Sequence, residues 1–317
     1  MSDHLREQIL AKASELNYHC ALPRQNSEVS AGTETPYSVA VAVCRPETSI
    51  FWTSIIHRVA QELSQHDVNL VYVYLPYCPA PDYVLPSTLS SASVQGMIVL
   101  NVYDGTLLHL LTGLSLPKVF LDTSAHIPVA RLGGDLMMME NTVPVRQITE
   151  HLISQGRKKI GFIGDIHYAK SNLERYDGYV SAMEAHRLPI SPCFLLTGPF
   201  GPDSYQEEIS LAVEQLPELP DAFVCVNDYV GGILLQTLLQ KNVKIPYDVA
   251  VSGFDDNAEN PLSATLSTVR VFNLDIGRRL AMQILYRMEH PDARFETIYI
   301  SSQLVLREST EGNKPDT

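Results

Sequence analysis

Polar and aromatic side chains follow four short apolar runs of this 317-residue sequence, at points where strands are expected to end. They are Phe51 and Trp52 after the first run, Ser171 and Arg175 after residues 160–163, Asn227 after 222–226, and Asp255 after 249–254. A guanidinium donates two parallel hydrogen bonds, a carboxylate accepts from hydroxyl groups, and aromatic faces cover C–H surfaces. Together these residue types suit a small polyhydroxylated or heterocyclic ligand.

Each of these residues also has a purely structural alternative. Phe51 and Trp52 are equally well explained as core residues of the helix that follows. Taken singly, Arg175 is better explained by a surface ion pair. Asp228 and Asp256, beside the same strand ends, are better explained as helix caps than as ligand contacts. The predicted binding site therefore depends on the joint position of these groups after strands.

The elements that must position these residues alternate between strands and helices. Eight apolar, β-branched runs predict strands, at Ser38–Cys44, Leu70–Leu75, Met97–Leu100, Lys118–Leu121, Ile160–Ile163, Ala222–Val226, Val249–Phe254 and Thr297–Val305. Amphipathic helical patterns separate most of them. This alternation predicts an α/β fold with parallel sheets covered on both faces, either one doubly wound sheet or two smaller ones. In either arrangement, ligands lie beyond the carboxyl ends of the strands.

Composition and absent motifs narrow the function. The net charge of −13 disfavours nucleic-acid binding by the surface as a whole. No apolar run is long enough to span a membrane, and the first residues carry no signal core, so we expect a cytoplasmic protein. The five cysteines are widely spaced and form no ligand pattern, so neither a metal nor a cofactor is expected.

Catalysis is not expected, because the dinucleotide, P-loop, hydrolase-elbow and zinc-protease motifs are absent. Two other classes stay open. One is a solute-binding protein, which would need export. The other is an enzyme acting on a sugar or nucleoside, for which Asp255 and Asp256 are the best carboxylate pair.

Several strings in the second half of the chain resemble the lactose-repressor (LacI/GalR) family. They are Gly156–Gly164, Ser171 with Glu174-Arg175, Gly178-Tyr179 and Ala182-Met183, Pro220–Asp228, Ile245–Asp256, and Leu266–Val269. The similarity runs from about residue 3 to residue 310, and the strings occur in the family's order. The resemblance implies two Rossmann-like parallel-sheet lobes joined by three crossovers, with a ligand between them.

The resemblance also implies roles for individual residues. The family's cleft arginine falls on Arg175, its strand-end amide on Asn227 and its cleft aspartate on Asp255. Its aromatic pair falls on Phe51 and Trp52, with Phe200 and Ser171 as further cleft positions. The implied function is a transcriptional regulator controlled by a sugar-type or nucleoside-type effector, acting as a homodimer on operator DNA.

The resemblance has departures at both the cleft and the N-terminus. Ser49-Ile50 and Met139-Glu140-Asn141 differ from the family's patterns, so the resemblance assigns no ligand contact to the second segment. Residues 1–18 resemble the third helix of the DNA-binding headpiece, without the preceding recognition helix, and Pro23 disfavours a hinge helix at 19–36. Operator binding is therefore expected only if the missing headpiece is present. The expected lobes are 37–154 with 270–295 and 155–269 with 296–311, followed by a tail at 312–317.

Overall fold

The structure is a computed structural model, which describes residues 37–45, 49–90, 93–201, 204–257 and 264–312. Contacts group Pro36–Thr317 into one compact unit. The headpiece helix predicted at 1–18, the linker predicted at 19–36 and most of the predicted tail lie outside the described residues.

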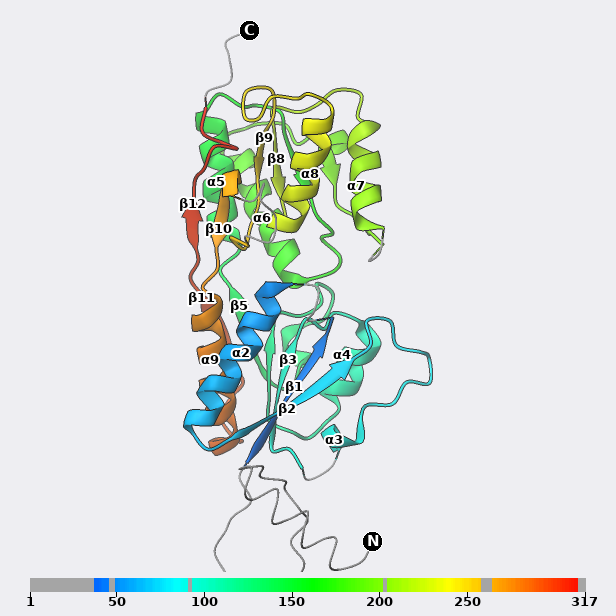
Figure 1. The fold of residues 1–317 in the computed structure, drawn as a ribbon, viewed down its shortest axis with the longest axis vertical. Coiled ribbons are helices and arrows are strands. Elements are labelled where there is room, and N and C mark those ends of the chain that lie inside the picture. The colour runs from blue at the N-terminus through cyan, green and yellow to red at the C-terminus, as the bar shows by residue number, and fades with distance from the viewer. Residues whose placement is uncertain (1–36, 46–48, 91–92, 202–203, 258–263, 313–317) are drawn as a thin grey trace, which may run out of the picture. The chain divides into compact units, whose positions relative to one another are not determined.

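A parallel six-stranded sheet builds the first lobe, in the order β11-β5-β4-β3-β1-β2 (Figure 1). Its strands are β1 (Ser38–Cys44), β2 (Asn69–Leu75), β3 (Gly96–Leu100), β4 (Lys118–Leu121), β5 (Asp135–Met139) and β11 (Thr297–Ile300). Successive side chains of a strand point to opposite faces. Val41 of β1 therefore packs in the same cluster as α2 (Ile50–Gln65), and Ala42 packs with α4 (Gly105–Thr112).

The remaining helices of this lobe cover the same two faces. The long helix α9 (Asn273–Glu289) packs against α2, β3 and β4. Leu89 of the short helix α3 (Ser87–Ser90) joins the cluster of α4, and Val129 of η2 (Val129–Arg131) packs at its border. Both faces of β1, an interior strand of the sheet, are thus buried, as its continuous apolar run predicts.

A parallel four-stranded sheet builds the second lobe, in the order β7-β6-β8-β9. Its strands are β6 (Ile160–Ile163), β7 (Leu195–Leu196), β8 (Ala222–Cys225) and β9 (Ala250–Ser252). Helix α5 (Thr142–Ser154) packs against α6 (Lys170–Ala185), and α7 (Tyr205–Glu214) packs against α8 (Asp228–Gln240). The turn η3 (Pro192–Phe194) precedes β7, and β10 (Thr268–Arg270) pairs antiparallel with β12 (Gln303–Val305) beside β9.

The chain passes between the lobes three times, from β5 to α5, from β10 to α9 and from β11 to β12. The two-lobed fold with three crossovers is therefore present as the resemblance implies. Two predicted boundaries differ. Helix α5, expected in the first lobe, packs on α6, because its buried residues Val145, Ile148 and Leu152 form a face toward the second lobe. Strand β11, expected in the second lobe, pairs with β5 at the edge of the first sheet.

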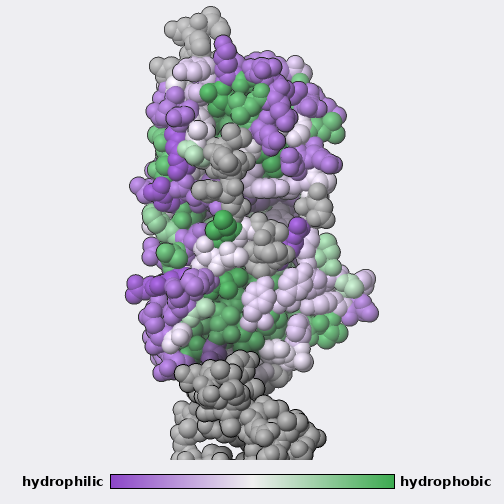
Figure 2. Space-filling model, in the orientation of Figure 1, coloured by the Kyte–Doolittle hydropathy of each residue, from purple (hydrophilic) through white to green (hydrophobic). Residues whose placement is uncertain are grey.

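The outer surface is of mixed polarity. Figure 2 shows hydrophilic and hydrophobic residues interspersed over one face of the molecule. Within the described ranges, none of the helices combines the length and the apolar character that crossing a membrane requires.

Candidate functional site: a cavity between the two sheets

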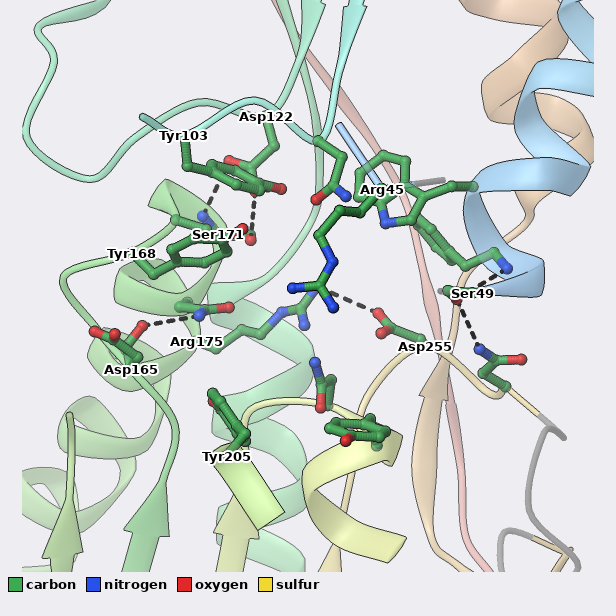
Figure 3. Close-up of a pocket in the computed structure, with 18 of the residues that line it drawn as sticks. Arg45, Ser49, Tyr103, Asp122, Asp165, Tyr168, Ser171, Arg175, Tyr205 and Asp255 are labelled. Atoms are coloured by element: carbon green, nitrogen blue, oxygen red, sulfur yellow. Dashed lines mark hydrogen bonds and ion pairs between the residues drawn. The ribbon is translucent and has the colours of Figure 1, made fainter. Parts of the chain in front are cut away.

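A cavity of about 390 Å³ lies between the carboxyl ends of the strands of both sheets (Figure 3). Nine strands each provide a wall residue: Arg45 after β1, Tyr77 after β2, Asn101 after β3, Asp122 after β4, Met139 at the end of β5, Asp165 after β6, Phe200 after β7, Asn227 after β8 and Asp255 after β9. Parallel strands carry their carboxyl ends to one edge of a sheet, so residues far apart in sequence converge there.

All seven residues predicted for the site line this cavity. They are Phe51, Trp52, Ser171, Arg175, Phe200, Asn227 and Asp255. The surface alternative for Arg175 does not hold, because its side chain is only 4% exposed. Phe51 fits both explanations, because its side chain is buried in the core of the first lobe and also lines the cavity. Its ring meets the edge of Trp52 at 4.9 Å between centroids.

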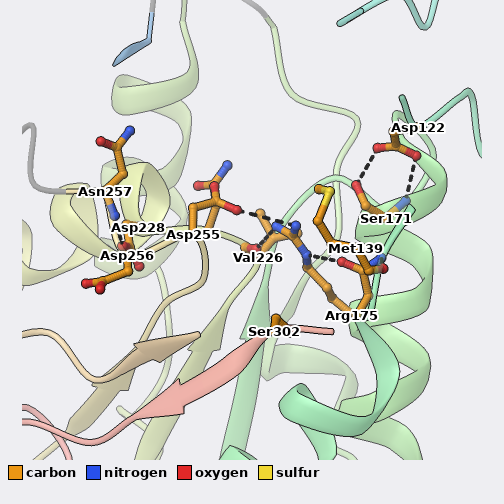
Figure 4. A network of polar contacts seen from close by, with 12 residues as sticks. Asp122, Met139, Ser171, Arg175, Val226, Asp228, Asp255, Asp256, Asn257 and Ser302 are labelled. Atoms are coloured by element: carbon orange, nitrogen blue, oxygen red, sulfur yellow. Dashed lines mark hydrogen bonds and ion pairs between the residues drawn. The ribbon is translucent and has the colours of Figure 1, made fainter. Parts of the chain in front are cut away.

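The guanidinium of Arg175 is held from three directions (Figure 4). Nε donates to Asn141 Oδ1 at 2.9 Å, Nη1 donates to Val226 O at 2.7 Å, and Nη2 lies 3.4 Å from Asp255 Oδ1. Its Cζ atom lies 3.6 Å from the centroid of the Phe254 ring. Because the guanidinium is planar, these contacts fix the direction of all five N–H groups before a ligand arrives.

Asn141 gives the segment 139–141 a structural role in the site. This buried side chain accepts from Arg175 and donates to Met139 O at 2.8 Å and to Glu174 Oε2 at 2.9 Å. Glu174 Oε1 in turn accepts from the Tyr299 hydroxyl at 2.7 Å. Asn141 therefore orients Arg175, while Met139 lines the cavity itself.

The loop after β9 separates two neighbouring carboxylates. Asp255, at φ 106°, and Asp256, at φ 53°, both have left-handed backbone conformations that are uncommon for these residues. Only Asp255 of this pair lines the cavity. Asp256 accepts from Arg270 Nε at 2.6 Å and from Arg307 Nη2 at 2.5 Å. Although burial opposes it, hydrogen bonding to Arg307 and Arg270 lowers the pKa of Asp256.

Helix starts bring two further polar groups to the wall. Asn227 caps α8, with its Oδ1 accepting from Val230 N at 2.9 Å. Asp228, the first residue of α8, accepts from Thr268 Oγ1 at 2.6 Å and from Asn257 N at 2.8 Å, so it is not the cap. Ser49 caps α2 and accepts from Asn257 Nδ2 at 3.3 Å, a contact between the lobes.

Asp122 forms a second contact between the lobes. Its carboxylate accepts from Ser171 Oγ at 2.6 Å, Ser171 N at 3.2 Å, Thr123 N at 2.8 Å and Tyr103 Oη at 3.2 Å. Burial raises the pKa of Asp122 against these hydrogen bonds. The backbone extends the contact, since Lys170 N donates to Thr123 O at 2.7 Å.

The sequence did not mark fourteen of the 21 residues that line the cavity. The missed residues include Arg45, Tyr77, Asn101, Tyr103, Asp122, Asp165, Tyr168, Tyr205 and Tyr229. A signal was available for Asn101 and Asp122, because each directly follows a predicted strand. No pattern marks Tyr103 or Tyr168, which lie in loops and meet only in the folded protein, at 4.4 Å between ring centroids.

A cavity between two parallel α/β lobes, lined by one fixed arginine, several carboxylates and aromatic rings, defines a small-molecule-binding protein. The model of the periplasmic binding protein-like domain family matches residues 149–310. The PurR transcriptional repressor of Haemophilus influenzae is 27% identical over 312 residues, covering 96% of this chain and 89% of that protein. The GalR transcriptional regulator of Lacticaseibacillus casei is 26% identical over 316 residues, covering 96% and 89%.

A solved structure of the transcriptional regulator CelR in complex with cellobiose has the same fold. Its TM-score is 0.76 at 22% identity, and the match covers 98% of this chain and 91% of that one. The chain belongs to the periplasmic binding protein-like family, as an effector-binding core of the LacI/GalR group of transcriptional regulators.

The acidic groups of the site are not arranged as a metal centre. Within the described residues, no three His, Cys, Asp or Glu side chains come close enough together to hold a metal ion. The carboxylates of Asp122 and Asp255 are instead bound by Ser171 and Arg175 respectively.

Proposed function

We propose that this chain is the sensing core of a transcriptional regulator, and that a sugar-type ligand binds in the cavity between its lobes. The observation that carries the proposal is the fixed guanidinium of Arg175, 3.4 Å from Asp255, in a cavity with aromatic walls. Sugar hydroxyls accept from N–H groups and donate to carboxylates, and sugar C–H faces cover aromatic rings.

The fold supports a change of lobe arrangement as the signal. Three crossovers join the lobes, and Asp122–Ser171 and Ser49–Asn257 contacts bridge the cavity. A ligand that touches both walls favours one arrangement only by its difference in affinity for the two. In a homodimer in the cytoplasm, that difference would change the spacing of paired DNA-binding headpieces on operator DNA.

Calorimetry with variants of Arg175 and Asp255 tests the binding site. Arg175→Lys keeps the charge and loses the planar fork, and Asp255→Asn keeps the shape and loses the charge. Each is expected to weaken sugar binding by at least tenfold, as expected when a charged hydrogen bond of about 1.5–3 kcal/mol is lost. Arg146→Ala is the matched control, because its ion pair with Glu150 lies on the exposed face of α5.

The ligand is first found by a thermal-shift screen over pentoses, hexoses, disaccharides and nucleosides, since binding to the folded state raises its stability. Unchanged affinity in both site variants would refute the proposal that the sugar binds in this cavity. A screen in which only nucleosides raise the melting temperature would replace the sugar with a nucleoside.

A further inference from the structure

Two histidines from different lobes lie opposite each other beside the ligand cavity. His126 follows β4 in the first lobe, and His167 follows β6 in the second. Their ring centroids are 5.7 Å apart, and the ring planes are inclined by only 16°. Both residues are exposed, and neither lines the cavity. We propose that this pair binds a divalent transition-metal ion of the zinc, nickel or copper type, and that the ion bridges the two lobes.

Backbone pairing between the lobes places the two histidines in register. Ser124 of the first lobe and Ala169 of the second form an antiparallel bridge. The pairing continues two residues away from this bridge in each direction, as Asp122 with Ser171 (Figure 3) and as His126 with His167. Residues two positions apart on an extended segment share a face, and directly opposite residues are near neighbours. The contact between the two rings is therefore a consequence of how the two segments pair.

The backbone of each histidine is held by a turn, while its ring stays in solvent. His126 N donates to Ser124 Oγ at 3.4 Å, and His167 N donates to Asp165 Oδ1 at 2.9 Å. Serine and aspartate side chains that accept from the backbone two residues on stabilise turns of this kind. The χ2 torsion of histidine is broad and roughly two-fold, so each exposed ring can turn either nitrogen toward the other. Binding an ion therefore needs the ordering of two rings and no rearrangement of the backbone.

The separation of the rings suits two imidazoles that share one ion. Zinc binds histidine nitrogen at about 2.0–2.1 Å, which puts the centres of two rings on one ion roughly 5–6 Å apart. The 5.7 Å between these centroids lies in that range. An ordinary aromatic contact has a similar separation. The two differ in what they need from the rings, because an ion needs the nitrogen atoms and an aromatic contact does not.

The ligand set selects the kind of metal. Imidazole suits zinc, copper and nickel ions, whereas magnesium and calcium take oxygen ligands. In the part of the chain that the structure describes, no third His, Cys, Asp or Glu completes a cluster, so water takes the remaining positions on the ion. A site with only two protein ligands is open to solvent, unlike the closed four-ligand site of a structural zinc. Its occupancy therefore follows the free concentration of the metal.

An ion held by both histidines favours the lobe arrangement in which their rings face each other. When the lobes separate, each keeps one imidazole, and the ion loses half of its protein ligands. This difference in affinity is what shifts the equilibrium between arrangements. The shift does not depend on which molecule occupies the cavity.

Two amide groups beside the pair report on the separation of the lobes. Lys170 N donates to Thr123 O at 2.7 Å, and Ser171 N donates to Asp122 Oδ1 at 3.2 Å. Lys170 and Ser171 begin α6, so their N–H groups have no partner within that helix. Only the contact with the first lobe protects them, and hydrogen exchange at these two amides therefore measures how often the lobes part.

The binding experiment titrates zinc chloride into the full chain without any sugar. At ten times its Kd, zinc is expected to raise the melting temperature by about 2–4 °C, and magnesium chloride is expected to leave it unchanged. His126→Phe and His167→Phe each keep an aromatic ring and are each expected to weaken zinc binding at least tenfold by calorimetry. The double variant is expected to bind no more weakly than either single variant, because both histidines hold one ion. His109→Phe, at an exposed position in the last turn of α4, is the matched control.

Hydrogen exchange tests the bridge between the lobes. Zinc is expected to slow exchange at Lys170 and Ser171 at least fivefold in the natural chain and in His109→Phe, and to leave it unchanged in His126→Phe and His167→Phe. Zinc binding that is absent from the natural chain, or that survives in either site variant, overturns the metal site. Binding that both variants lose, with exchange unaltered by zinc in the natural chain, overturns the bridge. Neither result bears on sugar binding, which is measured separately.

Discussion

Asp228 is the buried carboxyl whose ionisation is expected to change the stability of the protein near neutral pH. Its side chain is nearly inaccessible and accepts from Thr268 and Asn257. Burial, and then the charge of Asp255, raises the pKa of Asp228 to about 7 from 3.8, against these hydrogen bonds. Between these two values the folded protein holds a proton that the unfolded chain has released, so stability falls as pH rises through this window.

The size of the effect follows from the shift. One pKa unit corresponds to about 1.4 kcal/mol, so the loss from pH 5 to pH 8 is about 2–3 kcal/mol. Urea unfolding of the natural chain and of Asp228→Asn at several pH values measures it, because all other groups titrate in both proteins. The free energy of unfolding of the natural chain is expected to fall by that amount relative to the variant.

Asp275→Asn, at an exposed position in the first turn of α9, is the matched control. A difference between Asp228→Asn and the natural chain that stays constant within about 0.5 kcal/mol from pH 5 to pH 8 would refute the reasoning. Asp228 would then be ionised throughout, and its two hydrogen bonds would outweigh burial.

Two further predictions concern the framework of the lobes. Arg287→Ala leaves the fully buried Asp135 without its ion pair, now 2.7 Å long, and is expected to lower the free energy of unfolding by about 3–5 kcal/mol in urea. Gly178→Ala places a Cβ 2.4 Å from Thr142 O where α5 and α6 pack, and is expected to cost about 1–3 kcal/mol by thermal unfolding. Gly105→Ala, with open space around it, is the control, and an equal loss there would contradict the packing argument.

The strands that the sequence predicts are rich in β-branched residues, and the missed strand β5 has none. All eight predicted runs contain strands of the structure. Strand β5 is missed because Asp135 and the leucine and methionines after it include no β-branched residue. The run 297–305 is two strands in different lobes, and hydrophobic pattern cannot show this, because it marks a strand without naming its partner.

The residues of the candidate site can likewise be divided into those that the sequence predicts and those that it does not. Asn227 and Asp255 were predictable because a strand end places each of them at the edge of a sheet. Arg175 lies in α6, beyond the loop that follows β6, and the family resemblance marked it. Tyr168 was not predictable, because its place depends on rings from the other lobe. Sequence pattern thus indicates which residues reach the carboxyl edge of each sheet. It does not indicate what the opposite lobe brings to meet them.

The hydrogen bonds that hold Arg175 connect the proposed ligand site with the crossovers between the lobes. Asn141 stands in the crossover from β5 to α5, and Tyr299 stands just before the crossover from β11 to β12. Glu174 accepts hydrogen bonds from both, at 2.9 Å and 2.7 Å, and Asn141 also accepts from Arg175. A hydrogen-bonded network of this kind, buried at Arg175 and Asn141 and exposed at Tyr299, keeps all its contacts only in a narrow range of geometries. We therefore expect a ligand bound to the guanidinium to change the hydrogen bonding of two of the three crossovers, which are the segments that any rotation of the lobes must bend.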